Sequence, residues 1–71
     1  GLLLRGASVH GRGMIEPLTA VFLDASGTVL AVRCLQPGGL VRHPAAAWTL
    51  ELPVSIPPPS VGARLAGTLP R

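Results

Sequence analysis

LTAVFLDASGTVLAVRCL, residues Leu18 to Leu35, is the stretch of the sequence that decides the fold. Residues 18–23 are apolar on both alternating faces, with a single threonine, which is typical of a central strand. Asp24 is favoured at the first position of a type I turn, and Gly27 suits the left-handed residue of a hairpin loop. Residues 28–35 then return with β-branched side chains. The sequence therefore predicts a β-hairpin that turns between Asp24 and Gly27.

The β pattern continues on both sides of this hairpin. Residues 2–4 are three leucines, which predict a short buried strand. Residues 48–52 alternate between apolar and polar side chains, so one set faces the core and the other faces water. The inward set, which we expect to share one core with Phe22, is Trp48, Leu50 and Leu52, and the outward set is Thr49 and Glu51. This phase predicts that Trp48 is buried rather than an anchor for a partner.

Prolines and glycines divide the rest of the chain. Three consecutive prolines at 57–59 predict an extended connection, and we place a proline-rich connection over residues 54–60. Residues 61–69 fit either a strand or a short turn of helix. Short strands between such turns are typical of an all-β fold. We expect a small, partly open β-barrel or roll of about five short strands, with little helix.

The composition fits one small domain. The chain has 71 residues, a net charge of +3 and one cysteine. We expect a single β domain over residues 1–71, or a fragment of a slightly longer one. Apolar runs are far shorter than a membrane-spanning helix needs, and a lone cysteine gives no internal disulfide. The expected compartment is the cytoplasm, with export left open because the chain starts at Gly1.

The positive charge comes from six arginines without a lysine. Nucleic-acid-binding proteins cluster such residues and interleave aromatic side chains, whereas these arginines are dispersed and Phe22 and Trp48 are the only aromatic residues besides the histidines. Weak nucleic-acid binding is therefore kept as an alternative function and is not the expected one.

The spacing around the hairpin resembles a known family. The segment Ser8-Val9-His10 is followed by Met14, then Pro17, then Val21-Phe22-Leu23-Asp24 and Gly27. This order is similar to the "VHTFGM.FPIDVVFLD..G.V" stretch of domain-of-unknown-function family 192, whose members are small bacterial and archaeal β-barrel proteins. Leu35-Gln36-Pro37 and Thr49-Leu50-Glu51-Leu52-Pro53 stand where the family has its proline loop and its "VLEL" strand.

The match runs from about Leu2 to Pro53. The chain has Thr19 where the family has an aspartate, and Ala66-Gly67-Thr68-Leu69 where the family has a "G…GD" turn. The family's arginine-rich opening has no counterpart before Gly1. The resemblance implies a β-barrel that is truncated or diverged at both ends, and it implies no activity because the family has none established.

His10, Met14 and Arg12 are the candidate ligand-binding residues. Imidazole and thioether groups suit a soft metal such as Cu(I), with His43 and Cys34 as further ligands from distant loops. The alternative reading is that Met14 plugs one end of the barrel, while His10 lies on the closing loop and bonds a backbone carbonyl. We expect this second arrangement, with a shallow cleft beside His10 and with no metal or other cofactor.

A catalytic reading pairs His10 with Asp24 as acid and base in a minimal hydrolase or lyase. Against it, Asp24 is already needed at the turn, and Cys34 lies mid-strand, where we expect a buried thiol. Asp24, Gly27, Phe22, Trp48 and Pro17 are therefore read as structural. The predicted function is a non-enzymatic small β-barrel that binds a partner protein or a small ligand. The sequence does not fix its oligomeric state.

Overall fold

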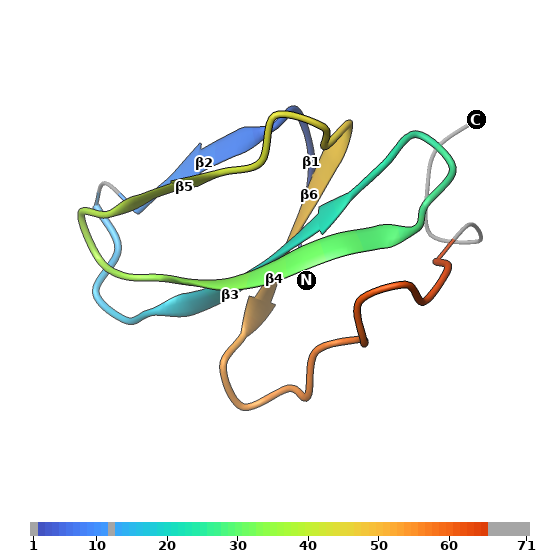
Figure 1. Cartoon of the computed structure of the whole chain (residues 1–71). Coiled ribbons are helices and arrows are strands. Elements are labelled where there is room, and N and C mark those ends of the chain that lie inside the picture. Colours follow the sequence, from blue (N-terminus) through green and yellow to red (C-terminus); the bar gives the residue numbers. More distant parts are fainter. Residues whose placement is uncertain (1, 12, 66–71) are drawn as a thin grey trace.

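The computed structural model describes residues 2–11 and 13–65 and is all-β, as predicted (Figure 1). Within these residues, six strands form a four-stranded sheet in the order β1-β6-β3-β4 and a two-stranded ribbon of β2 and β5, all antiparallel. The strands are β1 (Leu2–Arg5), β2 (Ser8–His10), β3 (Leu18–Leu23), β4 (Val29–Leu35), β5 (Leu40–Arg42) and β6 (Trp48–Pro53). No helix in the described ranges is long and apolar enough to span a membrane.

The predicted hairpin is present as β3 and β4. The two strands pair from Leu18 with Leu35 to Leu23 with Val29, with a bulge near the turn. The backbone N–H of Gly27 donates to the carbonyl of Asp24 at 3.0 Å, and Gly27 adopts a positive φ of 90°, which glycine reaches without steric cost. Because β3 also pairs with β6 along its whole length, it is the central strand that its apolar residues predict.

The other four strands form one long, bent antiparallel pair. One arm of this pair consists of β1 and β2, which residues 6–7 connect, and the other consists of β5 and β6, which residues 43–47 connect. The second arm therefore has three extra residues at the bend. The bend starts at Gly6, which has a φ of 125°. It folds the β2–β5 ribbon over one face of the sheet (Figure 1).

The first core lies between the ribbon and the sheet. Its buried members are Val9, Ala20, Phe22, Ala31 and Leu35, with Leu4, Met14, Val41 and Ala46 packed against them. Thr49, which the alternation predicts to face water, is only 1% exposed on this side. It is Phe22's partner in β3–β6, and its hydroxyl donates to the carbonyl of Gly6 at 3.1 Å, so burial costs it no hydrogen bond. Glu51 is half-buried.

The second core lies on the opposite face of the sheet. Val21, Leu23 and Val29 are buried there, and Trp48, Leu50 and Leu52 pack against them. The expectation that these three residues share a core with Phe22 is wrong. Cross-strand partners point to the same face, and β6 pairs Trp48 with Leu23 and Leu50 with Val21, which puts Phe22 on the other side.

Residues 54–65, here called the strap, return across the second face (Figure 1). The N–H of Val29 donates to the carbonyl of Ala63 at 2.8 Å, and the N–H of Gly62 donates back to Val29 at 2.8 Å. Leu65 donates to Gly27 at 2.7 Å. Ala63 and Leu65 therefore pack over the start of β4 in an extended, strand-like arrangement. Of residues 61–69, Val61 and Gly62 lie in a turn closed by the bond from the N–H of Ala63 to the carbonyl of Ser60 at 3.0 Å, and Arg64 forms a single antiparallel bridge with Thr28, so the described part is neither a full strand nor a turn of helix; residues 66–69 lie outside the described residues.

Candidate functional site

His10 and Met14 lie on opposite sides of the ribbon. His10 is the last residue of β2, not part of a loop, and its side chain is exposed beside Leu40, its partner in β5. Its neighbour Val9 points into the core, so alternation turns His10 outward. Met14 packs inward against the first core, as the plug reading expects. Because one side chain faces out and the other faces in, they form no joint site.

His10 and Asp24 also lie apart. The end of β2 and the β3–β4 turn lie at opposite ends of the molecule (Figure 1). One carboxylate oxygen of Asp24 accepts bonds from the Ser26 hydroxyl at 2.6 Å and from the backbone N–H groups of Ser26 and Thr28 at 2.9 Å each. The Ser26 hydroxyl above all, and then the Thr28 N–H, hold the pKa of Asp24 below its ordinary value of 3.8. This carboxylate is committed to the turn.

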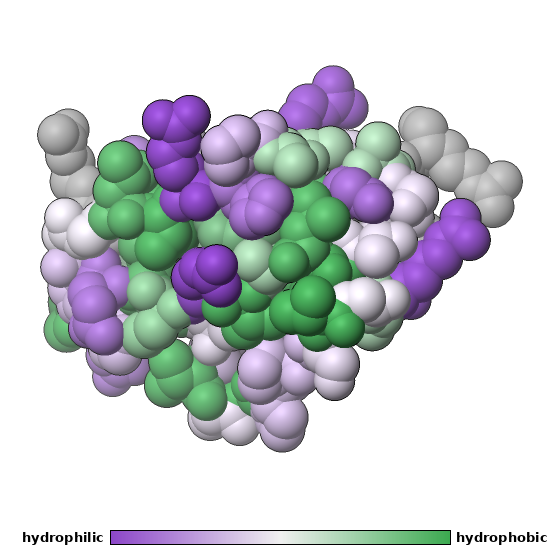
Figure 2. Space-filling view, in the orientation of Figure 1, coloured by the Kyte–Doolittle hydropathy of each residue, from purple (hydrophilic) through white to green (hydrophobic). Residues whose placement is uncertain are grey.

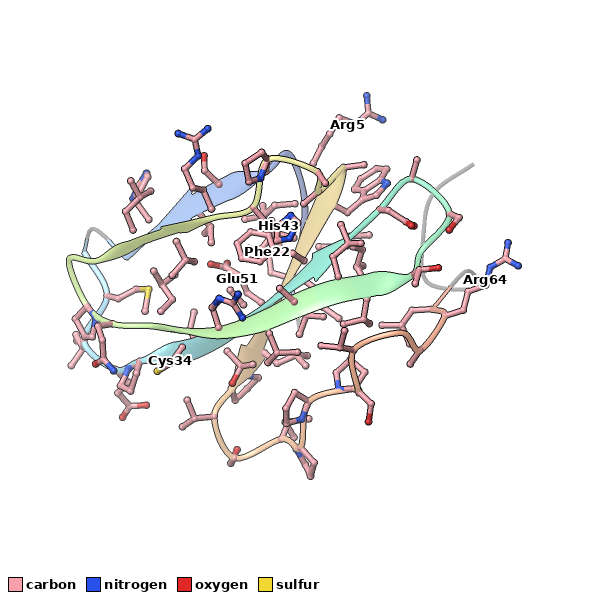
Figure 3. All side chains as sticks on the ribbon, viewed as in Figure 1. Arg5, Phe22, Cys34, His43, Glu51 and Arg64 are labelled. Atoms are coloured by element: carbon pink, nitrogen blue, oxygen red, sulfur yellow. The ribbon has the colours of Figure 1, made fainter. Side chains whose placement is uncertain are left out.

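The remaining metal-ligand candidates do not converge. His43 stands beside Phe22 with ring centroids 6.0 Å apart, and its Nδ1 accepts the N–H of Ala45 at 3.3 Å (Figure 3). Cys34 lies on β4 and is exposed, which corrects the expectation of a buried thiol. It is exposed because the hydrogen bonds of the strap reach only the beginning of β4. Residues 2–11 and 13–65 contain no group of three metal-binding side chains.

Arg12 and Pro17 both belong to the segment between β2 and β3. Arg12 lies outside the described residues. Pro17 is half-buried immediately before β3. In the same region, Gly11 is buried and a Cβ on it would overlap the carbonyl oxygen of Gln36, so this glycine allows the ribbon to close against the β4–β5 turn. The N–H of Gly11 donates to Gly39 at 2.8 Å, and Gly38 donates back to Gly11 at 2.8 Å.

Three of the described arginines lie in different parts of the structure. Arg5 lies over the Trp48 ring at 5.1 Å, while the Nε of Arg64 donates to the carbonyl of Ser26 at 3.4 Å near the β3–β4 turn. Figure 3 shows these two side chains leaving the molecule at different places. Arg33 donates through Nη1 to the carbonyl of Val32 at 3.0 Å. Their scatter gives no basic stripe along which a nucleic-acid backbone would lie.

The second face of the sheet has the properties of an interaction surface. Ala63 and Leu65 of the strap pack over this face near the start of β4, but the other hydrophobic side chains that pack there are only half-buried. We call this set the open face; it comprises Leu3, Val32, Trp48, Leu50 and Leu52. Figure 2 shows hydrophobic surface where β4 meets the strap. The strap adds Val54, Ile56 and Val61, all exposed.

Sequence reasoning missed the open face because alternation shows which side chains share a face but not what covers that face. In the described ranges the structure contains no pocket. Comparisons of the chain with protein-family models, with curated proteins and with solved structures found no match. The resemblance to family 192 therefore stays a prediction.

Proposed function

We propose that this chain is a non-enzymatic binding module whose open face receives a partner protein. The observation that carries the proposal is the unequal covering of the two sheet faces. On the ribbon side, Phe22 and Leu35 are fully buried, whereas on the strap side Leu50 and Leu52 keep part of their surface in water. Hydrophobic side chains gathered at the surface of a small domain are typical of interaction sites.

The free energy gained by burying the open face is large enough for binding. Fully burying a leucine or valine side chain is worth ~1.5–3 kcal/mol relative to leaving it exposed, so a partner that buries the remainder of several half-exposed side chains gains several kcal/mol. The net affinity is smaller because association costs translational and rotational entropy. A module of moderate affinity is the expected result.

Trp48 is half-buried, not fully buried as the alternation predicts, and with Arg5 it is an expected anchor. Tryptophan and arginine are the residue types that most often dominate binding energy when a partner removes water from around them. Here the guanidinium of Arg5 already lies 5.1 Å from the Trp48 ring centroid, a cation–π arrangement that limits the freedom of both side chains. The conformational entropy that these two side chains lose when a partner docks is therefore reduced.

Site-specific photo-crosslinking in the source cells tests this proposal. A photoreactive phenylalanine analogue is placed at Leu52, on the open face, and at Leu40, which is 65% exposed on the outer side of the ribbon. Circular dichroism first confirms that both variants fold. The expected result is one dominant crosslinked protein from position 52 and none from position 40. Crosslinking from position 40 alone, or from neither position, would contradict the proposal.

We also propose that the chain is a distant relative of family 192 in a bacterial cytoplasm. The spacing from Val9 through Pro17 to Gly27 supports the kinship, and the all-β fold agrees with it. A single exposed thiol, Cys34, is compatible with a reducing compartment. A homologue of intermediate sequence that keeps both the spacing from Val9 to Gly27 and the strand from Thr49 to Pro53 would support the kinship.

A further inference from the structure

The four-stranded sheet has two edges, and β4 is the protected one. The strap occupies its first part through the hydrogen bonds of Ala63 and Gly62 with Val29. Further along, Arg33 folds back and its Nη1 donates to the carbonyl of Val32 at 3.0 Å. The pairing of β3 with β4 also contains a bulge. A covered edge, an arginine on the edge and a bulge are the means by which sheet proteins prevent further strand pairing.

The other edge, β1, has no covering segment and no bulge in the described residues, and its one arginine, Arg5, is its last residue. Its sequence is Leu-Leu-Leu-Arg, without a proline or a charge before Arg5, and its pairing with β6 is regular. Leu2 is 55% exposed. In the part of the chain that the structure describes, no strand other than β6 pairs with β1. A regular edge whose first three residues are uncharged is a template for another strand.

The ladder fixes which backbone groups of β1 face outward. The N–H of Gly6 donates to the carbonyl of Ala47 at 2.9 Å, which continues the register of β1 with β6. Because successive residues of an antiparallel strand direct their hydrogen-bonding groups to alternate sides, Leu4 and Leu2 bond β6. The N–H and C=O groups of Leu3 and Arg5 therefore point away from the sheet.

Beyond the proposed function, we propose that a second copy of this chain pairs with this edge, β1 against β1, antiparallel, with the two-fold axis at Leu3. In this register the two Leu3 residues exchange two backbone hydrogen bonds, and Leu2 of each copy lies opposite Leu4 of the other. Each Arg5 lies two residues beyond the axis, so the two guanidinium groups are about 13 Å apart along the strands at 3.3 Å per residue. No like charges face each other across the pairing.

The pairing also joins the two open faces. Leu3 lies in the same cross-strand row as Leu50 and Val21, so two copies bring two such rows together into one eight-stranded sheet. The contact is small, because β1 has four residues. Interfaces of this size are weak and transient, so the dimer is expected to form in the high micromolar to millimolar range.

Chemical synthesis allows an atomic test, because the single Cys34 permits ligation of residues 1–33 to residues 34–71. Methylation of the Leu3 backbone nitrogen removes an outward N–H without changing a side chain. Methylation of the Val32 nitrogen is the matched control. The carbonyl of Val32 accepts a hydrogen bond from the Arg33 side chain, so the backbone groups of Val32 point outward from the β4 edge. Sedimentation equilibrium from about 10 µM to 1 mM then covers the range in which a weak interface assembles.

The unmodified chain and the Val32-methylated chain are expected to dimerise with the same dissociation constant, and the Leu3-methylated chain is expected to stay monomeric. The amide resonances of Leu3 and Arg5 should shift with concentration only in the first two. A chain that is monomeric throughout, or a dimer that survives methylation at Leu3, overturns this inference. The outcome of this dimerisation experiment does not affect crosslinking from position 52. The partner-binding proposal is therefore tested independently of the dimer.

Discussion

At the scale of single residues, Asp24 organises the turn on which the hairpin depends. One carboxylate oxygen accepts three hydrogen bonds, from the Ser26 hydroxyl and from two backbone N–H groups. This interaction can be predicted from the sequence because both residues act locally. The aspartate side chain bonds the backbone of the next few residues, and the glycine adopts a positive φ. No distant contact is needed to recognise them.

The first prediction concerns acid stability. The hydrogen bonds from Ser26 and Thr28 lower the pKa of Asp24 in the folded state below its ordinary value of 3.8. A lowered folded-state pKa means that the charged form stabilises the fold above pH 3.8 and that this stabilisation is lost as the pH falls through the folded-state pKa. Asp24→Asn should remove this part of the pH dependence below pH 4 in urea titrations, and Asp24→Glu should weaken it. Parallel acid curves for wild type and Asp24→Asn would contradict it.

The second prediction separates Phe22 from Trp48. Phe22 is fully buried between ribbon and sheet, so Phe22→Ala should cost ~3–5 kcal/mol and abolish cooperative unfolding in so small a domain. Trp48 is half-buried, so Trp48→Ala should cost about half as much and leave a folded protein with a lower melting temperature. Calorimetry of both variants is the measurement. Equal losses would show that both side chains are core residues.

At the scale of elements, the sequence predicts segments whose signals are local and misses those that depend on distant partners. The hairpin of β3 and β4 and the strand at β6 follow from alternation and turn residues. The strands β2 and β5 have three residues each, too few for a periodic signal, and exist because each pairs with the other across about thirty residues of chain.

The sidedness of β6 could not be predicted for a related reason. Alternation shows that Trp48 and Leu50 share a face, but the face is fixed by the register with β3, which places Leu23 opposite Trp48. A shift of one residue in that register would put Trp48 with Phe22. Register between strands that are far apart in the sequence is set by tertiary packing.

The third prediction concerns the strap. Gly62 has a φ of 90° and its N–H donates to Val29, so Gly62→Pro is incompatible with both the backbone angle and the hydrogen bond. The variant should release the strap and speed hydrogen exchange of the Val29 amide, which donates to Ala63, at least about tenfold, equivalent to ~1.4 kcal/mol. Ser60→Ala, at an exposed position, is the control, and the Gly6 amide is the internal reference. Unchanged exchange at Val29 would show that the strap does not protect β4.

At the scale of the whole molecule, the two faces of one sheet have different roles. The ribbon buries one face, and Thr49 is accommodated there by its bond to Gly6. The strap covers the other face only near the start of β4 and leaves Leu3, Leu50 and Leu52 half-buried. A chain of this length buries a smaller fraction of its surface than a larger domain does, so a partner on the second face adds to stability as well as to function.

Paramagnetic relaxation of methyl groups by a soluble, uncharged gadolinium chelate measures both faces in one experiment. On the open face, the methyl groups of Leu3, Leu50 and Leu52 should relax strongly in proportion to chelate concentration, while those of Val9, Ala20 and Leu35 should be almost unaffected. Leu40, on the outer side of the ribbon, gives the value for full exposure. If the chelate relaxed the methyl groups of Leu50 and Leu52 as little as those of Leu35, the proposal that this face is open to a partner would be contradicted.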